Sequence, residues 1–194
     1  MAAKGNDTRQ RIIDAAYRLI AKYGYDKASV SKICEEVGVT KPSVYYYFGS
    51  KEGIFLAVLD NLYASRDYTS EFEHVVDSQD YRVRLHELGH SILAGYLDDQ
   101  ERRNILAEID LQSTRIPALA NLKASLDSEM TEAFDTILRK GVEIGALDGS
   151  LNTKLAAQTL FIVTVGMSQT VSNREEIDED LVWDWAIDKL LPEA

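Results

Sequence analysis

The stretch SVSKICEEVGVTKPSVYYYFGSK, residues 29–51, decides how this chain folds. Its first part carries apolar side chains at i, i+3, i+4 and i+7, the spacing of one helix face: Val30, Ile33, Cys34 and Val37. Gly38 is placed to end that helix, and Thr40 to cap a second short helix that tolerates Pro42 in its first turn. Two short helices joined by a tight glycine turn predict a helix-turn-helix.

The second helix of this pair has an outward face that suits DNA. Thr40, Lys41, Ser43 and Tyr46 point away from the small core that Val44 shares with the first helix. Such side chains can reach base edges in a major groove. The spacing is only moderately specific, because unrelated helical hairpins also match it.

Helical periodicity continues through most of the chain. Residues 66–82 are polar and lack a clean period, so we expect a fraying helix and a loop there. No convincing alternating strand pattern is present, and the predicted fold class is therefore all-α with about nine helices. We expect helices over 8–23, after Ser29, after Thr40, after Ser50, and over about 80–97, 100–113, 117–144, 153–172 and 178–191.

Composition excludes several classes of protein. The 194 residues are 45% apolar and 27% charged, and a single cysteine allows no internal disulfide. No apolar run reaches the roughly 18 residues of a membrane span, and residues 1–11 lack the apolar core of a secretory signal. We therefore expect a cytoplasmic protein with no membrane partner. The net charge is −11, but residues 1–53 carry +3 and the rest −14, which suggests two functions in one chain.

Several fixed-spacing segments fill the first quarter of the chain. They are IDAA (13–16), YGY (23–25), SV (29–30), Ile33, GVTK (38–41) and VYYYFGSKE (44–52). Together they resemble the signature of the tetracycline-repressor (TetR) family, over about residues 8–60. The remainder is similar only in architecture and in the stretch Gly141-x-x-x-Gly145-x-Leu147.

The resemblance implies a homodimeric, ligand-responsive transcription regulator, most often a repressor, that needs no cofactor. Residues 1–52 would form a three-helix DNA-binding domain that recognises an inverted-repeat operator in double-stranded DNA. Residues 53–194 would bind an unidentified small-molecule effector and form the dimer. A helix from Lys51 to about His74 would connect the two, so that the effector changes the spacing of the two reading heads.

The family pattern also assigns contacts by position. Residues that would touch bases or adjacent backbone are Thr40, Lys41, Pro42, Ser43 and Tyr46. Residues that would touch phosphates are Tyr45, Tyr47 and Lys51, with Ser29 and Ser31 as further positions. Many members have a small residue where Pro42 stands and histidine where Tyr47 stands, so base preference cannot be transferred. Phe48 is expected in the core, whereas Tyr45 divides between the core and a phosphate contact.

A second motif competes with this interpretation. His86-Glu87-Leu88-Gly89-His90 is an H-E-x-x-H sequence, which on a helix could hold zinc with Glu87 as general base. Glu108 or Asp110 would supply a third ligand. The alternative function is thus a zinc-dependent hydrolase or a metal sensor. We favour an organic effector pocket with no metal and no catalysis, lined by Tyr63, His86, His90, Tyr96, Gln112, Met130, Phe134 and Phe161.

The last two helices carry more apolar surface than one chain needs. Trp183 and Trp185, with a stripe on 153–172, either form the dimer core or line a ligand site. We favour the dimer core. The stripe consists of Leu155, Thr159, Leu160, Val163, Met167 and Thr170.

Overall fold

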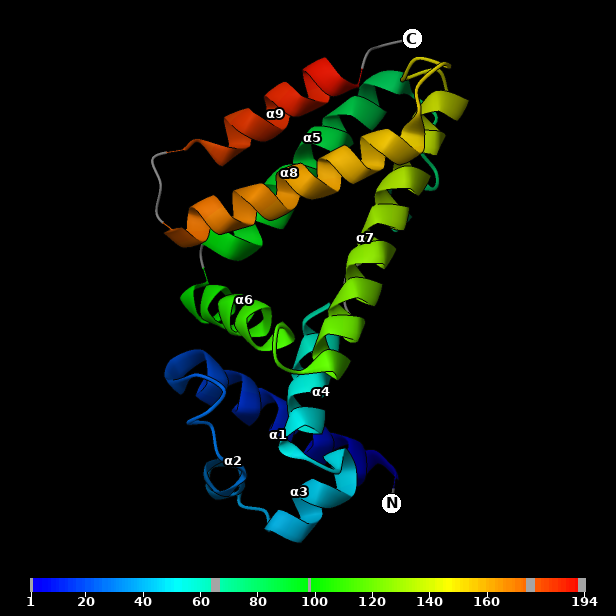
Figure 1. The fold of residues 1–194 in the computed structure, drawn as a ribbon. Helices are drawn as coiled ribbons and strands as arrows, with labels where there is room; N and C mark the ends of the chain where they lie inside the picture. Colours follow the sequence, from blue (N-terminus) through cyan, green and yellow to red (C-terminus); the bar gives the residue numbers. More distant parts are fainter. Residues whose placement is uncertain (1, 64–66, 98, 174–176, 192–194) are drawn as a thin grey trace. The chain divides into compact units, whose positions relative to one another are not determined.

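The structure, a computed structural model, describes residues 2–63, 67–97, 99–173 and 177–191. Side chains 2–6, 95–97, 170–173 and 190 lie outside the description as well. Within these ranges the regular elements are all helical, as predicted (Figure 1). They are α1 (Ala2–Tyr23), α2 (Val30–Val37), α3 (Lys41–Phe48), α4 (Lys51–Tyr63), the 3₁₀ turn η1 (Ser70–Phe72), α5 (Ser78–Leu97), α6 (Gln100–Ser113), α7 (Pro117–Glu143), α8 (Thr153–Asn173) and α9 (Glu179–Leu190).

The chain forms two compact units, and each combines two separate stretches of sequence. The first unit is Met1–Arg66 with Gln100–Leu126, and the second is Asp67–Asp99 with Asp127–Ala194. The first therefore holds α1–α4, α6 and the start of α7. The second holds η1, α5, the rest of α7, α8 and α9.

The first unit has one continuous apolar core. Side chains of α6 and of the start of α7 join the same buried cluster as those of α1, α2 and α4. The amide of Asn104 on α6 also donates a hydrogen bond to the carbonyl of Ala21 on α1, at 3.0 Å. Residues 100–126 are thus packed into the unit that carries the helix-turn-helix. Central members of this cluster are Ile12, Ile13, Ala16, Ile33, Val44, Phe55, Leu59, Ile105, Ile109 and Leu119.

The helix boundaries follow from local capping. The hydroxyl of Ser29 accepts a hydrogen bond from the backbone of Lys32, and Gly38 takes a left-handed φ of 75° that favours glycine. Ser50 likewise accepts from the backbone of Gly53 at 2.9 Å. Thr40 occupies the expected N-cap position, but its side chain makes no capping hydrogen bond.

The connecting helix expected to reach about His74 is shorter than predicted. α4 ends at Tyr63, residues 64–66 lie outside the description, and a non-helical segment begins at Asp67. The Asp67 carboxylate accepts hydrogen bonds from the backbone of Thr69 and Ser70. These local bonds compete with helical ones and favour a turn. Phe72 and Val75, in the predicted loop, are buried.

The core of the second unit is built around large aromatic residues. Trp183 is fully buried and donates from its ring nitrogen to the carbonyl of Leu85 at 3.1 Å. Gly89 permits this packing, because a Cβ there would lie 2.1 Å from the indole. Trp183 therefore belongs to the core of its own chain, neither to a dimer surface nor to a ligand site. Trp185, two residues later, is 61% exposed.

Candidate nucleic-acid interface and effector pocket

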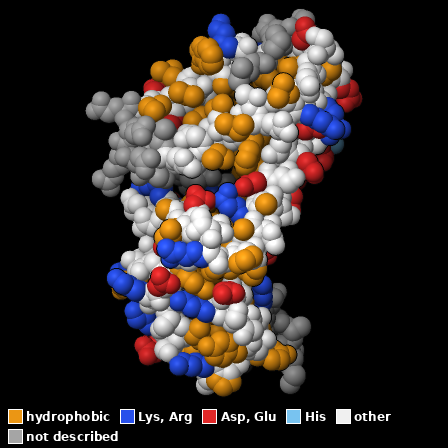
Figure 2. Space-filling model, in the orientation of Figure 1, with side chains coloured by type: hydrophobic (Ala, Val, Ile, Leu, Met, Phe, Trp, Pro, Cys, Tyr) orange, Lys and Arg blue, Asp and Glu red, His pale blue; other side chains and the backbone are white. Residues whose placement is uncertain are grey.

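The helix α3 presents the predicted base-contacting side chains to the outside. Val44 is fully buried against the rest of the head, whereas Tyr46 is 82% exposed. Thr40, Lys41 and Pro42 are also exposed, and Ser43 is half-buried. Figure 2 shows apolar side chains and Lys and Arg side chains together on the part of the first unit that carries α2 and α3. The geometry thus leaves the first turn of α3 open to a DNA groove.

The aromatic run 45–48 divides between surface and core. Tyr45 is 45% exposed, which excludes the core alternative for this residue. Tyr47 and Phe48 are half-buried and pack against the apolar core, so that Phe48 is partly core, as expected. The ring of Tyr47 also meets that of Tyr46 edge-on, at 5.4 Å between centroids.

Lys51, one of the predicted phosphate positions, is held in place by intramolecular contacts. Lys51 donates to the carbonyl of Asp26 at 3.2 Å, and its ammonium lies 4.3 Å from the centroid of the Tyr25 ring. Burial lowers the pKa of Lys51, against the opposing attraction of Asp26 and Glu108. Burial also raises the pKa of Tyr25, with smaller contributions from Glu52 and Asp26. Ser31 is half-buried on α2.

In the second unit, the two histidines of the H-E-x-x-H sequence lie on one face of α5 and meet α9. His86 Nδ1 lies 2.6 Å from Asp184 Oδ1, and His90 Nε2 lies 3.1 Å from the same oxygen. His86 Nε2 is also 3.5 Å from Asp188. Burial acts to raise the pKa of Asp184, but the hydrogen bonds and charges of His86 and His90 outweigh it and hold this pKa below its ordinary value.

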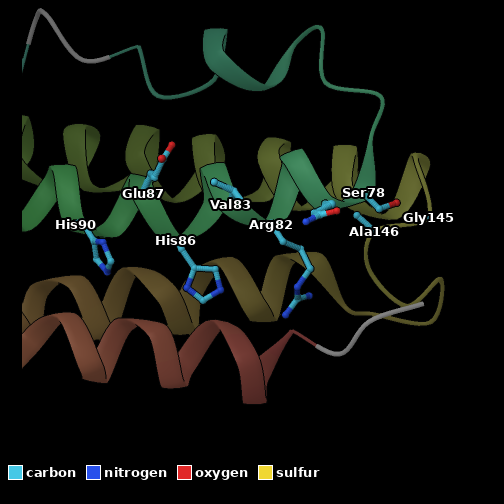
Figure 3. Close-up of a pocket in the computed structure, with 9 residues that line it drawn as sticks. Ser78, Arg82, Val83, His86, Glu87, His90, Gly145 and Ala146 are labelled. Atoms are coloured by element: carbon cyan, nitrogen blue, oxygen red, sulfur yellow. The ribbon is translucent and has the colours of Figure 1, made fainter.

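These histidines line a cavity of about 640 Å³ within the second unit (Figure 3). A cavity of this size is typical of small-molecule sites. Sequence reasoning named Glu87 as a possible general base and missed the other lining residues, although Arg82 could have been found by its spacing of four residues from His86. The lining consists of Ser78, Gln79, Arg82, Val83, His86, Glu87, His90, Gly145 and Ala146.

The other predicted effector residues are distributed differently. Phe134 is 1% exposed and packs 6.3 Å from Trp183, so it is a core residue; Met130 and Phe161 are half-buried in the same unit. Tyr63 and Gln112 belong to the first unit, where Tyr63 packs against the core and Gln112 is 3% exposed. The side chain of Tyr96 lies outside the described residues.

The predicted third zinc ligands belong to the first unit, whereas His86 and His90 belong to the second. The carboxylates that face His86 and His90 come from α9. Glu108 and Asp110, predicted as third ligands, instead contact Gln112 and Lys123. In the part of the chain that the structure describes, no three His, Cys, Asp or Glu side chains are arranged to hold a metal ion.

The fold and the exposed α3 define a helix-turn-helix DNA-binding protein. Comparison with known proteins narrows this class. Residues 12–58 match the family model described as bacterial regulatory proteins, tetR family. Residues 12–58 therefore carry a DNA-binding domain of the tetR type, and the curated relatives that the chain resembles over most of its length are transcriptional regulators.

Three relatives illustrate the likeness. The chain is 28% identical over 187 residues to the HTH-type transcriptional repressor NicS of Pseudomonas putida, covering 95% of this chain and 85% of that protein. A TetR transcription regulator from Haloarcula marismortui has a TM-score of 0.80 at 19% identity, covering 96% and 100%. FadR from Bacillus subtilis, solved in complex with stearoyl-CoA, has a TM-score of 0.69 at 23% identity, covering 94% and 97%. None of the described helices is long and apolar enough to cross a lipid bilayer.

Proposed function

We propose that this regulator is a homodimeric repressor that leaves its operator when a small molecule binds in the second unit. The observation that carries the proposal is the open first turn of α3, with Lys41 exposed and Tyr46 82% exposed, in a chain whose residues 12–58 match this family model. NicS is described as a repressor, and FadR binds an acyl-CoA, which supports both halves of the proposal.

In this proposal α3 reads the operator in the major groove. Lys41 is the best placed side chain for a bidentate contact with guanine, because it is exposed in the first turn of α3. Tyr45 and Lys51 contact phosphates, which position the head without reading sequence. The proposed base contacts are those of Thr40, Lys41, Pro42, Ser43 and Tyr46, and the proposed phosphate contacts those of Ser29, Ser31, Tyr45, Tyr47 and Lys51.

The dimer forms through a second copy on the outer face of α8 and α9. This face is apolar yet exposed, which is unusual for a surface that stays in water. A two-fold dimer places identical heads about one helical turn of DNA apart, roughly 34–36 Å, and therefore selects an inverted repeat. The exposed residues are Leu155, Ile162, Leu181, Val182 and Trp185.

The effector occupies the cavity beside α5 and acts through elements shared by the two units. α7 is one such element, because residues 117–126 belong to the first unit and 127–143 to the second. A shift of α7 lowers the affinity for the operator. A coupling free energy of about 1–3 kcal/mol corresponds to a change in that affinity of roughly five- to 150-fold. The same proposal includes a functional boundary between residues 52 and 53, a cytoplasmic location and the lack of an enzymatic activity.

Footprinting on the DNA upstream of the protein's own gene tests this function. The expected result is a protected inverted repeat whose affinity falls steeply with salt, because phosphate contacts release counterions. A gel shift at two salt concentrations measures that dependence. Absence of specific protection there and across a library of genomic fragments would contradict the proposal.

A further inference from the structure

We propose that the cavity beside α5 takes an organic anion, whose carboxylate replaces Asp184 as the partner of protonated His86 and His90. This inference rests on the proposed effector role of the cavity and names the chemical class of the effector. It starts from a ladder of paired side chains between α5 and α9.

The ladder has three positions on each helix, each four residues apart, running in opposite directions. Arg82 pairs with Asp188 at 3.6 Å, and His86 pairs with Asp184 at 2.6 Å. His90 lies 3.1 Å from Asp184 and 3.8 Å from Asp180. Spacing by four residues keeps each set on one helix face, so α5 presents a row of nitrogen groups to a row of carboxylates.

Only the nitrogen row lines the cavity. Arg82, His86 and His90 are among its lining residues, whereas the three aspartates of α9 are not (Figure 3). Ser78 and Gln79 add a hydroxyl and an amide that can donate hydrogen bonds. Among the lining residues that the structure describes, Glu87 is the single carboxylate. A ligand in this cavity therefore meets hydrogen-bond donors and two imidazoles that become positively charged when protonated. The apolar wall beside them consists of Val83, Gly145 and Ala146.

The partners of the histidines are exchangeable. The side chains of His86, His90 and Asp184 are 27%, 42% and 36% exposed, so their hydrogen bonds lie at the surface and are screened by water. Moving these bonds from Asp184 to a ligand carboxylate conserves their number and charge type. The exchange releases Asp184, which precedes the exposed Trp185 of the proposed dimer face, and so links the cavity to α9.

Protonation decides whether the row attracts an anion. With both imidazoles neutral, α5 offers Arg82 alone, and Arg82 is engaged by Asp188 and by the carbonyl of Leu191. With both protonated, α5 carries three positive charges beside the cavity. The charged groups facing the histidines are those of the ladder and Glu87. The other elements packed on α5 contribute little: α8 has Lys154 as its one charged residue, and Glu71 of η1 acts on Arg84. α7 also packs on α5, where Tyr81 donates to the carbonyl of Ile137, and the charged side chains near the end of α7 pair with one another, Arg139 with Asp135 and Lys140 with Glu143.

Three probes of similar size and different charge distinguish the ligand class: benzoate, benzamide and benzylamine. Each is titrated calorimetrically into the dimer at about pH 6 and about pH 8, on either side of the ordinary histidine pKa near 6.5. We expect benzoate to bind about tenfold more tightly at the lower pH with proton uptake, and benzamide and benzylamine not to bind. Binding of benzylamine, equal binding of benzamide, or no heat with benzoate overturns the proposal.

A matched pair of variants locates the site. His86→Gln/His90→Gln should lose benzoate binding, because glutamine stays neutral, and His74→Gln should keep it. His74 is the chain's third histidine, is exposed, and does not line the cavity. Histidine NMR of the native protein requires no variant: benzoate should shift the ring resonances of His86 and His90 and leave those of His74 unchanged. Benzoate binding that survives the double variant, or a shift confined to His74, contradicts the site.

The outcome of the benzoate titrations does not depend on whether the protein binds DNA. Operator affinity is measured on the same preparations without any probe. A protein that binds operator but not benzoate retains the proposed function and loses the anionic effector. A protein that binds benzoate but no operator retains the anionic effector site and loses the proposed function.

Discussion

The ammonium group of Lys51 lies over the ring of Tyr25, 4.3 Å from its centroid, and donates to the carbonyl of Asp26 at 3.2 Å. It therefore fastens the start of α4 to the turn that follows α1. Replacing Lys51 with alanine should lower the stability of the first unit by about 1 kcal/mol, the usual value of such a cation–π contact. Thermal unfolding followed by circular dichroism measures this loss.

The same variant should weaken DNA binding equally for all sequences and flatten the salt dependence, because a phosphate contact carries no base information. Lys32→Ala, in the same unit, is the control for loss of one exposed positive charge. A changed base preference in Lys51→Ala would refute a phosphate role.

Lys41 should behave in the opposite way. It is exposed in the first turn of α3 and, within the described part of the chain, makes none of the contacts that hold Lys51, so Lys41→Ala should leave the unfolding temperature unchanged. We expect it to cost about 1–3 kcal/mol of operator affinity and to relax preference at one base pair in each half-site. Binding to a set of single-base operator variants measures this, and a uniform loss across the set would assign Lys41 to the phosphates.

Ile162 tests the proposed dimer face. It is 68% exposed on α8, so Ile162→Glu should leave the protomer folded but bury a charge wherever a second copy packs, at a cost of several kcal/mol. Sedimentation should show monomers, and operator affinity should fall with dimer loss. Leu111→Glu is the matched control, since Leu111 is 49% exposed on α6. A tight Ile162→Glu dimer would place the interface elsewhere.

Local signals were sufficient to predict the start and end of α2 and the start of α4. Ser29, Gly38 and Ser50 act through hydrogen bonds and backbone angles within a few residues of themselves, so sequence alone reveals them. The prediction of a connecting helix to about His74 was wrong because a local side-chain contact ends the helical segment. The turn at Asp67 forms because its carboxylate accepts backbone hydrogen bonds that compete with those of a helix. Hydrophobic periodicity does not reveal such a contact.

The buried face of α8 could not be predicted because this helix is apolar nearly all round, and α9 carries apolar side chains on two sides beside its row of aspartates. Periodicity placed Leu160 and Val163 on one stripe, yet Leu160 is fully buried in its own chain and Ile162 is the exposed residue. Trp183 and Trp185 lie two positions apart, roughly 200° around a helix, and so face opposite ways. Packing of α6 on α1 and pairing of His86 with Asp184 are long-range contacts, and one sequence does not say which helices meet.

Asp184 gives the ladder a defined dependence on pH. Despite burial, its histidine partners hold the pKa of Asp184 below the ordinary 3.8. Its contribution to stability is therefore complete above the unfolded pKa and is lost as the pH falls below about 4 through the folded value. Asp184→Asn should lower the unfolding temperature at neutral pH, and the difference from the native protein should shrink in acid. Asp60→Asn, on the exposed side of α4, should show no such convergence.

The histidine pair also separates an organic effector site from a metal site. Glutamine keeps polarity and hydrogen bonding but is a poor zinc ligand, so His86→Gln/His90→Gln removes a metal site while preserving most of the packing. We expect the chelated native protein and the double variant to bind operator with the same affinity, and neither to hydrolyse peptides when zinc is restored. The physical reason is that His86 and His90 are held by Asp184 within the second unit, whereas α3 belongs to the first. Elemental analysis of protein purified without a metal column measures the zinc content directly. Stoichiometric zinc that survives chelation, together with loss of operator control in the double variant, would replace the organic effector with a metal.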